Sequence, residues 1–172
     1  TATPSPRLHP TAPRATRGVT LASGRQYTSL VWSDEFAGPA GPSPSASKWM
    51  ADIGAWGSTN GELETYTASP ANAALDGRGR LAIVARKQTV TGPDGATRNY
   101  TSARIETPGL FSLTYGLIQA RMKIPAGAGL WPAFWMLGDS IKTVGWPNSG
   151  EIDVMETIGQ DPFTVHGTIH GP

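Results

Sequence analysis

Turn-forming residues recur along the chain at short intervals, and this spacing constrains the fold more than any other feature. The 172 residues include 21 Gly and 15 Pro, which is well above ordinary usage. Both residues are poorly tolerated inside helices, so a long-helix or coiled-coil protein is excluded. Turn signals such as Asp76-Gly77 and the run 147–150 separate short apolar segments. The pattern predicts one domain rich in strands and turns.

The segments between these turns show the period-two alternation of strands. Residues 118–124 alternate strictly between apolar and polar side chains, which is typical of a half-buried strand. The other expected strands are 28–33, 80–86, 100–106, 132–137, 150–157 and 163–169. The sequence shows neither an amphipathic helix nor an internal repeat. Short strands at near-regular spacing predict an antiparallel sandwich or barrel.

Composition and charge exclude several classes of function. No apolar run reaches the length of about 18 residues that a membrane-spanning helix needs, so no membrane partner is expected. Cysteine is absent, which excludes disulfides and thiolate metal sites. Residues 1–30 carry four Arg and no acid, whereas the rest is slightly acidic. Because the body of the chain is not basic, a nucleic-acid partner is not expected.

The first 26 residues differ in composition from the remainder. They are rich in Pro and Arg and poor in apolar residues, so they cannot bury enough apolar area to order themselves. We expect residues 1–26 to be a disordered leader or linker. The chain does not begin with Met, and we expect it to be processed or a fragment. Residues 27–172 are expected to hold the folded domain.

An acidic segment, GEIDVME at 150–156, carries the chemistry. On a helix its three acids would scatter around the axis. On a strand, Glu151 and Asp153 share one face, and Glu156 falls on the other because its offset is odd. One bulged residue near Met155 would correct the parity. All three carboxylates would then line one face while the apolar residues between them enter the core.

Three carboxylates on one face favour glycoside hydrolysis. This reaction needs one ionised carboxylate and one protonated carboxyl on either side of the scissile bond. An acid between two Glu side chains can help to set their different pKa values. Solvated acids on an edge strand are the alternative. A Ca²⁺ site is disfavoured because that ion takes six to eight oxygens from flexible loops.

An aromatic segment lies shortly before the acids. Trp131, Ala133 and Trp135 share one face of the expected strand, and Trp146 comes just before the acidic segment. Two indole rings with only Ala between them make a flat platform on which the apolar faces of sugars can stack. Burial of both rings in the core is the alternative. The two segments together favour a saccharide-binding cleft.

At these residues the sequence resembles glycoside hydrolase family 16, especially its laminarinase-like β-1,3-glucanases. The resemblance covers roughly residues 30–172 and rests on WSDEF at 32–36, NGELETYT at 60–67, GRLAIVAR at 79–86, YTSARIET at 100–107, YGLIQARMKIP at 115–125, GLWPAFWMLG at 129–138, GEIDVME at 150–156 and TVHGTIHGP at 164–172. The family implies an all-β fold, an antiparallel, concanavalin A-like β-jelly-roll sandwich. Residues 27–172 would form the N-terminal and central part of its catalytic domain.

The resemblance implies that the fold is incomplete in this chain. Family domains continue past the last matched segment, and sandwiches of this kind often run to about 200–250 residues. We therefore expect these 172 residues alone to expose unpaired strand edges and apolar sheet faces. Such a fragment would aggregate or be inactive.

The resemblance also implies roles for individual residues. Glu151 corresponds to the nucleophile, Glu156 to the acid/base and Asp153 to the assisting acid, with Met155 as the bulged residue. The implied substrate-binding residues are Trp131, Trp135, Asn60, Arg104 and His170. Arg104 is equally explained as an ion-pair partner of a nearby acid, and His170 as a hydrogen-bonded strand histidine. His166 has the same parity as His170 but weaker support. Glu62 and Glu64 are expected to be structural or at the rim.

No cofactor is implied for catalysis, but the family often binds a structural calcium ion far from the cleft. Glu35 and the backbone of Gly79 would be partial ligands. The implied partner is a β-glucan polysaccharide or oligosaccharide, and we expect the protein to be a monomer. Because polymeric glucans lie outside cells, we expect it to be secreted.

The function implied is a retaining endo-hydrolase of β-1,3-glucan that acts through a covalent glycosyl-enzyme intermediate. A non-catalytic β-glucan-binding module is one alternative, although such proteins generally lose one or both Glu residues. An agarase- or carrageenase-type hydrolase of the same family is a second. Transglycosylation is a third, because sugar can capture the intermediate in place of water.

Overall fold

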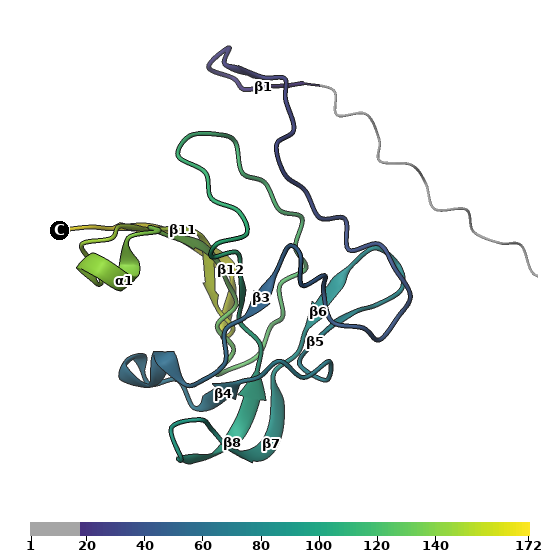
Figure 1. Cartoon of the computed structure of the whole chain (residues 1–172), viewed down its shortest axis with the longest axis vertical. Helices are drawn as coiled ribbons and strands as arrows, with labels where there is room; N and C mark the ends of the chain where they lie inside the picture. The colour runs from purple at the N-terminus through teal and green to yellow at the C-terminus, as the bar shows by residue number, and fades with distance from the viewer. Residues whose placement is uncertain (1–17) are drawn as a thin grey trace, which may run out of the picture. The chain divides into compact units, whose positions relative to one another are not determined.

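The computed structural model describes residues 18–172, except the side chains of residues 58 and 59. The chain divides into two compact units, the first ending at Gly116 and the second running from Leu117 to Pro172. In the described part of both units strands dominate, with one short 3-10 helix, η1 (Trp56–Asn60), and a single helical turn, α1 (Ile141–Val144) (Figure 1). Within residues 18–172, no helix has the length and apolar character needed to cross a bilayer. The expected all-β class is confirmed.

The first unit consists of small sheets built from short strands. Its strands are β1 (Val19–Thr20), β2 (Gln26–Tyr27), β3 (Met50–Ala51), β4 (Glu64–Tyr66), β5 (Ala73–Leu75), β6 (Leu81–Ile83), β7 (Arg86–Thr91), β8 (Thr97–Ser102) and β9 (Ile105–Glu106). β1 pairs with β2, β3 with β9 and β5 with β6, while β4, β8 and β7 form a three-stranded sheet in that order. The pairings are antiparallel, as expected, except that β4 and β8 are parallel.

A buried polar side chain ties two of these sheets together. Asn72 is only 1% exposed, and its Nδ2 donates to the Val84 carbonyl oxygen at 2.9 Å and to Thr101 Oγ1 at 3.0 Å. Its Oδ1 accepts a hydrogen bond from Thr67 Oγ1 at 2.7 Å. Because an unsatisfied buried amide is costly, this set of partners fixes the turn before β5 against β8.

An aromatic cluster includes Trp32, which lies in the segment 28–33 that was expected to be a strand. Trp32 meets Trp49 edge to face at 5.2 Å between ring centroids and stacks on Phe111 at 5.5 Å. Trp49 Nε1 donates to Asp34 Oδ2 at 2.9 Å. Residues 28–33 form no strand, so that prediction is wrong. The large rings are placed by packing on one another rather than by a ladder of backbone hydrogen bonds.

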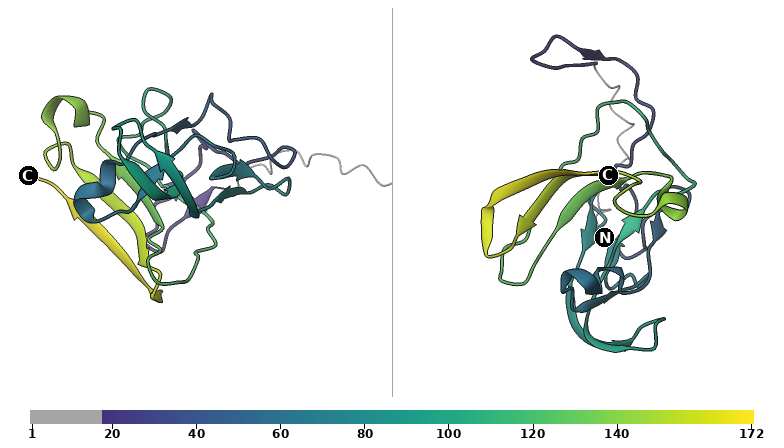
Figure 2. Two further views of the ribbon diagram at one scale, coloured as in Figure 1. Left: turned by 90° about the horizontal axis from the view of Figure 1, so that it is seen from below. Right: turned by 90° about the vertical axis from the view of Figure 1, so that its left-hand side faces the viewer.

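The second unit contains one antiparallel sheet of three strands, which positions the acidic segment. β10 (Ala133–Leu137), β11 (Glu151–Ile158) and β12 (Asp161–His170) lie in that order, and the long β11–β12 pair is plain in Figure 2. The predicted strands 132–137, 150–157 and 163–169 are therefore confirmed.

A bulge in β11 brings the three acids to one face of this sheet. The register pairs Glu156 with Ala133, Asp153 with Trp135 and Glu151 with Leu137, and it shifts by one residue between Phe134 and Trp135. The three β10 partners are spaced by two, so they share a face, and residues directly opposite share that face too. The extra residue lies between Asp153 and Glu156. The predicted bulge near Met155 is confirmed.

The opposite face of the sheet is apolar and largely open. Ile152 is 46% exposed and Val154 is 40% exposed, so the prediction that these residues enter the core is wrong. Met155 alone of the β11 apolar residues is buried. The second unit has a single sheet, and its own residues supply no second layer for this face. The exposed apolar sheet face expected from the sequence is present.

Other sequence-based boundaries also need correction. Residues 118–124 form no strand, because alternation predicts a face but not a hydrogen-bonded partner, and no segment within 18–172 pairs with them. The predicted strands 80–86 and 100–106 are each interrupted, the first after Ile83 and the second after Ser102. Of the expected leader, residues 1–17 lie outside the described residues, and 18–26 include β1 and the start of β2.

Candidate active site

The three acids of β11 differ in their exposure to solvent. Asp153 lies at the centre of the row and is 5% exposed, whereas Glu151 and Glu156 on either side are half-buried. Neighbouring strands flank all three. A row of this kind places one buried carboxylate between two that a ligand can reach.

The Glu151 end of the row is closed by an indole and an imidazole. Trp146 Nε1 donates to Glu151 Oε2 at 2.8 Å. His170 lies opposite Glu151 on β12, and its Nε2 is 3.1 Å from Asp153 Oδ2. The rings of Trp146 and His170 are 5.7 Å apart. Ligand atoms of Glu151, Asp153 and His170 all lie within 4.8 Å of one another, so these three groups interact strongly.

These neighbours perturb the acidity of Glu151. Burial raises the pKa of Glu151, and the adjacent Asp153 carboxylate raises it further by repulsion and by sharing a hydrogen bond. The N–H of Trp146 and the charge of His170 act in the opposite sense, because both favour the ionised carboxylate. On balance, the pKa of Glu151 lies above its ordinary value.

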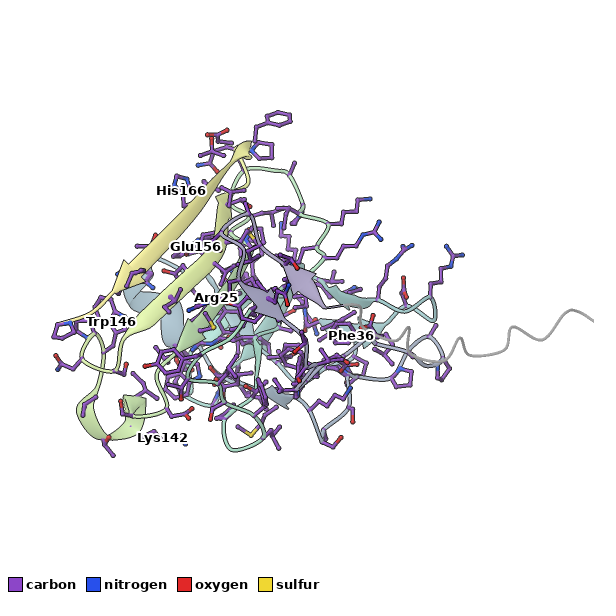
Figure 3. The ribbon with its side chains drawn as sticks, turned by 90° about the horizontal axis from the view of Figure 1, so that it is seen from above. Arg25, Phe36, Lys142, Trp146, Glu156 and His166 are labelled. Atoms are coloured by element: carbon purple, nitrogen blue, oxygen red, sulfur yellow. The ribbon has the colours of Figure 1, made fainter. Side chains whose placement is uncertain are left out.

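The Glu156 end of the row is open. Trp131 Nε1 donates to Glu156 Oε1 at 3.0 Å, and His166 lies opposite Glu156 on β12. In Figure 3, Glu156 and His166 lie toward the turn between β11 and β12, and Trp146 lies toward the other end of the pair. A cavity of about 500 Å³ adjoins Glu156. Its lining residues are Gly129, Leu130, Trp131, Glu156, Ile158, Gln160, His166 and Thr168.

A close backbone contact holds the loop that carries Trp131. Gly127 N donates to the Gly159 carbonyl oxygen at 2.8 Å, and Gly159 N donates to the Leu130 carbonyl oxygen at 2.7 Å. A Cβ at position 159 would collide with the carbonyl oxygen of Gly127. Glycine at this position lets the loop close on β11, and that closure places Trp131 over Glu156.

The two predicted platform tryptophans lie on the acidic side of the sheet. Trp135 is opposite Asp153 and is half-buried. Trp131 is 50% exposed, so the alternative that both rings belong to the core does not describe it. The exposed ring of Trp131 is available to a ligand that reaches Glu156.

Asn60 and Arg104, the other predicted ligand residues, belong to the first unit. Asn60 is exposed at the end of η1. Arg104 Nε lies 3.0 Å from Asp52 Oδ2, and Asp52 N donates to the Arg104 carbonyl oxygen. The ion-pair explanation of Arg104 thus has a named partner. The expectation that Glu62 is structural is supported by a hydrogen bond, which the Tyr66 hydroxyl donates to Glu62 Oε2 at 2.6 Å.

The predicted calcium ligands lie close to each other in the first unit. The carbonyl oxygen of Glu35 would be 3.4 Å from a Cβ built on Gly79, so the backbone of Glu35 passes close to Gly79. Calcium takes six to eight oxygens, and these two residues are a small part of such a set. The calcium ion stays a prediction.

Two residues beside the three acids, Trp146 and His166, are indicated less strongly by the sequence than the site residues that the family resemblance implies. The sequence places Trp146 near the acids, but only the fold shows that it hydrogen-bonds Glu151. His166 shares the parity of His170 along β12, and the register sets it opposite Glu156. The two-residue alternation of β12 was the signal for both histidines.

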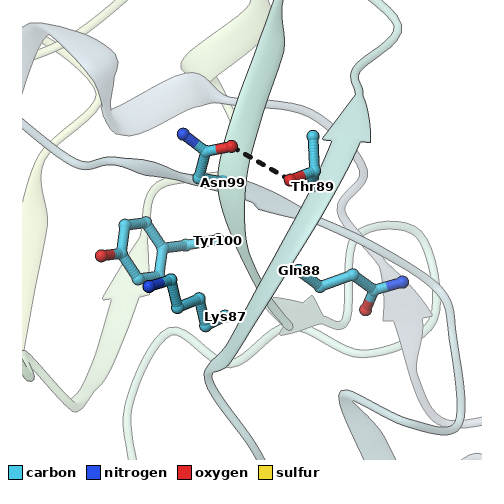
Figure 4. Close-up of a pocket in the computed structure, with 5 residues that line it drawn as sticks. All are labelled: Lys87, Gln88, Thr89, Asn99 and Tyr100. Atoms are coloured by element: carbon cyan, nitrogen blue, oxygen red, sulfur yellow. Dashed lines mark hydrogen bonds between the residues drawn. The ribbon is translucent and has the colours of Figure 1, made fainter.

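A second cavity, of about 510 Å³, lies on β7 and β8 in the first unit (Figure 4). Its lining residues are Lys87, Gln88, Thr89, Asn99 and Tyr100, and Thr89 Oγ1 donates to Asn99 Oδ1 at 3.1 Å. These side chains include no carboxylate, so this cavity lacks the acid pair that glycoside hydrolysis needs.

Comparison with known proteins identifies the family. A family model described as the XgeA-like catalytic GH16 domain matches residues 70–171, more than half of the chain. A β-glucanase of Rhodothermus marinus is 46% identical over 144 residues, which cover 82% of this chain and 48% of the relative. The chain belongs to glycoside hydrolase family 16.

Solved structures agree with this assignment. The endo-β-1,3-glucanase of Pyrococcus furiosus matches with a TM-score of 0.77 and 41% identity, over 90% of this chain and 59% of that one. The laminarinase catalytic domain of Thermotoga maritima matches with a TM-score of 0.74 and 46% identity, over 84% of this chain and 57% of that one. The likeness confirms the expected β-jelly-roll class. The chain spans about half the length of the curated relative above.

Proposed function

We propose that this chain carries the catalytic acids of a retaining endo-β-1,3-glucanase. The observation that supports the proposal most directly is the bulged strand β11, which places Glu151, Asp153 and Glu156 on one face. An indole N–H donates to each of the two Glu side chains. The similarity to an endo-β-1,3-glucanase and a laminarinase supports the choice of substrate.

In the first step Glu151 acts as the nucleophile. Its ionised carboxylate attacks the anomeric carbon and forms a glycosyl ester, while Glu156 gives its proton to the departing glycosidic oxygen. Trp146 Nε1 donates to the Glu151 carboxylate and favours the ionised form that this step requires. Asp153, buried next to Glu151, raises the cost of ionising it, and His170 offsets part of that cost.

In the second step water replaces the leaving sugar. Glu156, now ionised, takes a proton from the water molecule as its oxygen attacks the anomeric carbon, and the ester bond to Glu151 breaks. Two inversions give net retention at the anomeric centre. The half-buried position of Glu156 beside an open cavity suits a group that must meet both a leaving oxygen and a water molecule.

The proposal is tested by Glu151→Gln and Glu156→Gln in the full protein. Each variant should lower laminarin hydrolysis by about 100-fold or more, as expected for loss of a reacting carboxyl group. Asp139→Asn, an exposed acid in the same unit, is the matched control and should retain activity. Near-normal hydrolysis by either Gln variant would refute the assignment.

Substrate choice needs its own experiment. Release of reducing sugar from laminarin, lichenan, agarose and carrageenan should be greatest for laminarin, and dominant cleavage of agarose or carrageenan would replace the proposal by the hydrolase alternative. Binding to laminarin without any released sugar would favour a binding module. We expect the protein to be secreted, because polymeric β-glucan lies outside cells. We also expect it to be a monomer.

A further inference from the structure

The cavity on β7 and β8 lies on the exposed face of its sheet. Tyr100 is 42% exposed, whereas the next residue, Thr101, is 1% exposed, because successive residues of a strand point to opposite faces. The cavity holds about 510 Å³, which is within the range of sites for small molecules. It shares no lining residue with the cavity beside Glu156, so the acidic strand does not account for it.

The register places three side chains of different chemistry in one row across this face. Lys87 pairs with Tyr100 from one side, and Glu64, which does not line the cavity itself, pairs with Tyr100 from the other. Residues directly opposite one another on neighbouring strands share a face. The row therefore offers an ammonium group, an aromatic ring and a carboxylate in that order. An anion would be repelled by Glu64 and a cation by Lys87, so the row favours a neutral ligand.

A bulge in β7 orients a polar side chain of the cavity. The register shifts between Lys87 and Val90. Gln88 and Thr89 therefore both lie opposite Asn99. Thr89 Oγ1 donates to Asn99 Oδ1 at 3.1 Å, and Figure 4 shows the amide nitrogen of Asn99 pointing away from Thr89. The two N–H groups on that nitrogen are donors that a hydroxyl oxygen can accept.

We propose that this cavity is a second contact site for β-glucan, in which a sugar ring stacks on Tyr100 and its hydroxyls accept hydrogen bonds from Asn99 Nδ2 and Lys87 Nζ. An aromatic ring beside amide and ammonium donors suits a neutral sugar, because the apolar face of the sugar stacks while its hydroxyls bond to the donors. The choice of β-glucan rests on the proposed function. A polymeric substrate can contact two sites of one enzyme at once, and the second contact raises the overall affinity.

Binding is measured by affinity electrophoresis of the full protein in gels that contain laminarin, with Glu151→Gln in every sample so that the polysaccharide stays intact. Tyr100→Ala should raise the dissociation constant by about fivefold, as for loss of one stacked ring, and Tyr100→Phe should retain most of the affinity. Lys87→Ala should raise it by about threefold, as for one lost hydrogen bond. Lys142→Ala, which removes an exposed lysine of α1, is the matched control and should change nothing.

A short substrate separates this site from the acids. In proteins that keep Glu151, Tyr100→Ala should raise KM on laminarin and leave kcat/KM on an aryl β-laminaribioside within about twofold, because a disaccharide is too short to contact both sites. An equal loss on the short substrate would overturn the proposal, since Tyr100 would then belong to the catalytic cleft or to the fold. Unchanged laminarin binding by Tyr100→Ala would overturn it as well.

A gel that contains carrageenan tests the charge of the ligand. Retardation by carrageenan that Lys87→Ala abolishes, with laminarin binding unaffected by Lys87→Ala and Tyr100→Ala, would replace the proposal by an anionic polysaccharide site. If the protein without substitutions cleaves neither laminarin nor the aryl glycoside, the proposed function fails instead. Electrophoresis in laminarin still decides whether Tyr100 binds glucan in that case, because the measurement requires no catalysis.

Discussion

The two ends of the acidic row use the same residue types and give their glutamates different surroundings. Glu151 is enclosed by Trp146, Asp153 and His170. Glu156 has Trp131 on one side and His166 opposite, and it opens into a cavity. One end surrounds a carboxylate with an indole N–H, a second carboxyl group and an imidazole, and the other leaves room for a ligand. The difference shows that two glutamates on one strand can have different surroundings, and different surroundings can give the same side chain different acid–base properties.

The largest expected effect is on the anomeric configuration of the product when the Glu151 or Glu156 carboxylate is removed and azide is supplied. With an activated aryl substrate, Glu151→Ala should yield an α-glycosyl azide, because azide replaces the missing nucleophile in a single inversion. Glu156→Ala should yield a β-glycosyl azide, because azide attacks the ester already formed on Glu151. The anomer is read by NMR. Products of the same configuration from both variants would show that the two ends do not have different roles.

The next effect concerns the loop that shapes the Glu156 end. Gly159→Ala should lower the free energy of unfolding by about 1–3 kcal/mol, as for an overpacked site, because the new Cβ meets the Gly127 carbonyl oxygen. Chemical denaturation of the full protein measures this change. Gly171→Ala is the control, since a Cβ at position 171 has nothing within 4 Å. A similar loss in both variants would mean that the loop contact is not responsible.

A smaller effect should appear in the pH dependence of kcat/KM. The Trp146 N–H favours ionised Glu151, so Trp146→Phe should raise the pKa of Glu151 further. Because Glu151 must be ionised to act as the proposed nucleophile, the acidic limb of the profile would move to higher pH. Trp131→Phe, which removes the N–H at the other end, should leave the acidic limb in place. A shift in the opposite direction for Trp146→Phe would contradict the hydrogen bond as described.

The smallest effect is on stability. The pKa of Glu151 is raised above its ordinary value of 4.5 by burial, so the folded state holds this proton more tightly than the unfolded state. That contribution is present below the ordinary value and is lost as pH rises through the raised pKa. Glu151→Gln should therefore match the unsubstituted protein at low pH and be the more stable one at neutral pH. Thermal unfolding at the two pH values tests the sign, and greater stability of the unsubstituted protein at neutral pH would reverse it.

Sequence reasoning predicted the second unit better than the first. Residues 132–137, 150–157 and 163–169 became β10, β11 and β12 because each has a ladder partner close to it in the sequence. Residues 28–33 hold three successive apolar residues, Leu30, Val31 and Trp32, yet the tryptophan packs in an aromatic cluster and no strand forms. Residues 118–124 alternate most strictly and have no ladder partner within 18–172. Side-chain periodicity describes a face, whereas a strand also requires a neighbour.

The sequence by itself determined that Glu151, Asp153 and Glu156 can share one face of a strand only if that strand carries a bulge, because the offset from Glu151 to Glu156 is odd. It also determined the all-β class through its turn residues. Only the tertiary structure decided which indole meets which glutamate, and that the cavity opens beside Glu156. It also left Ile152 exposed. These outcomes depend on strand order, register and loop closure, which bring together residues far apart in the chain and which no local pattern encodes.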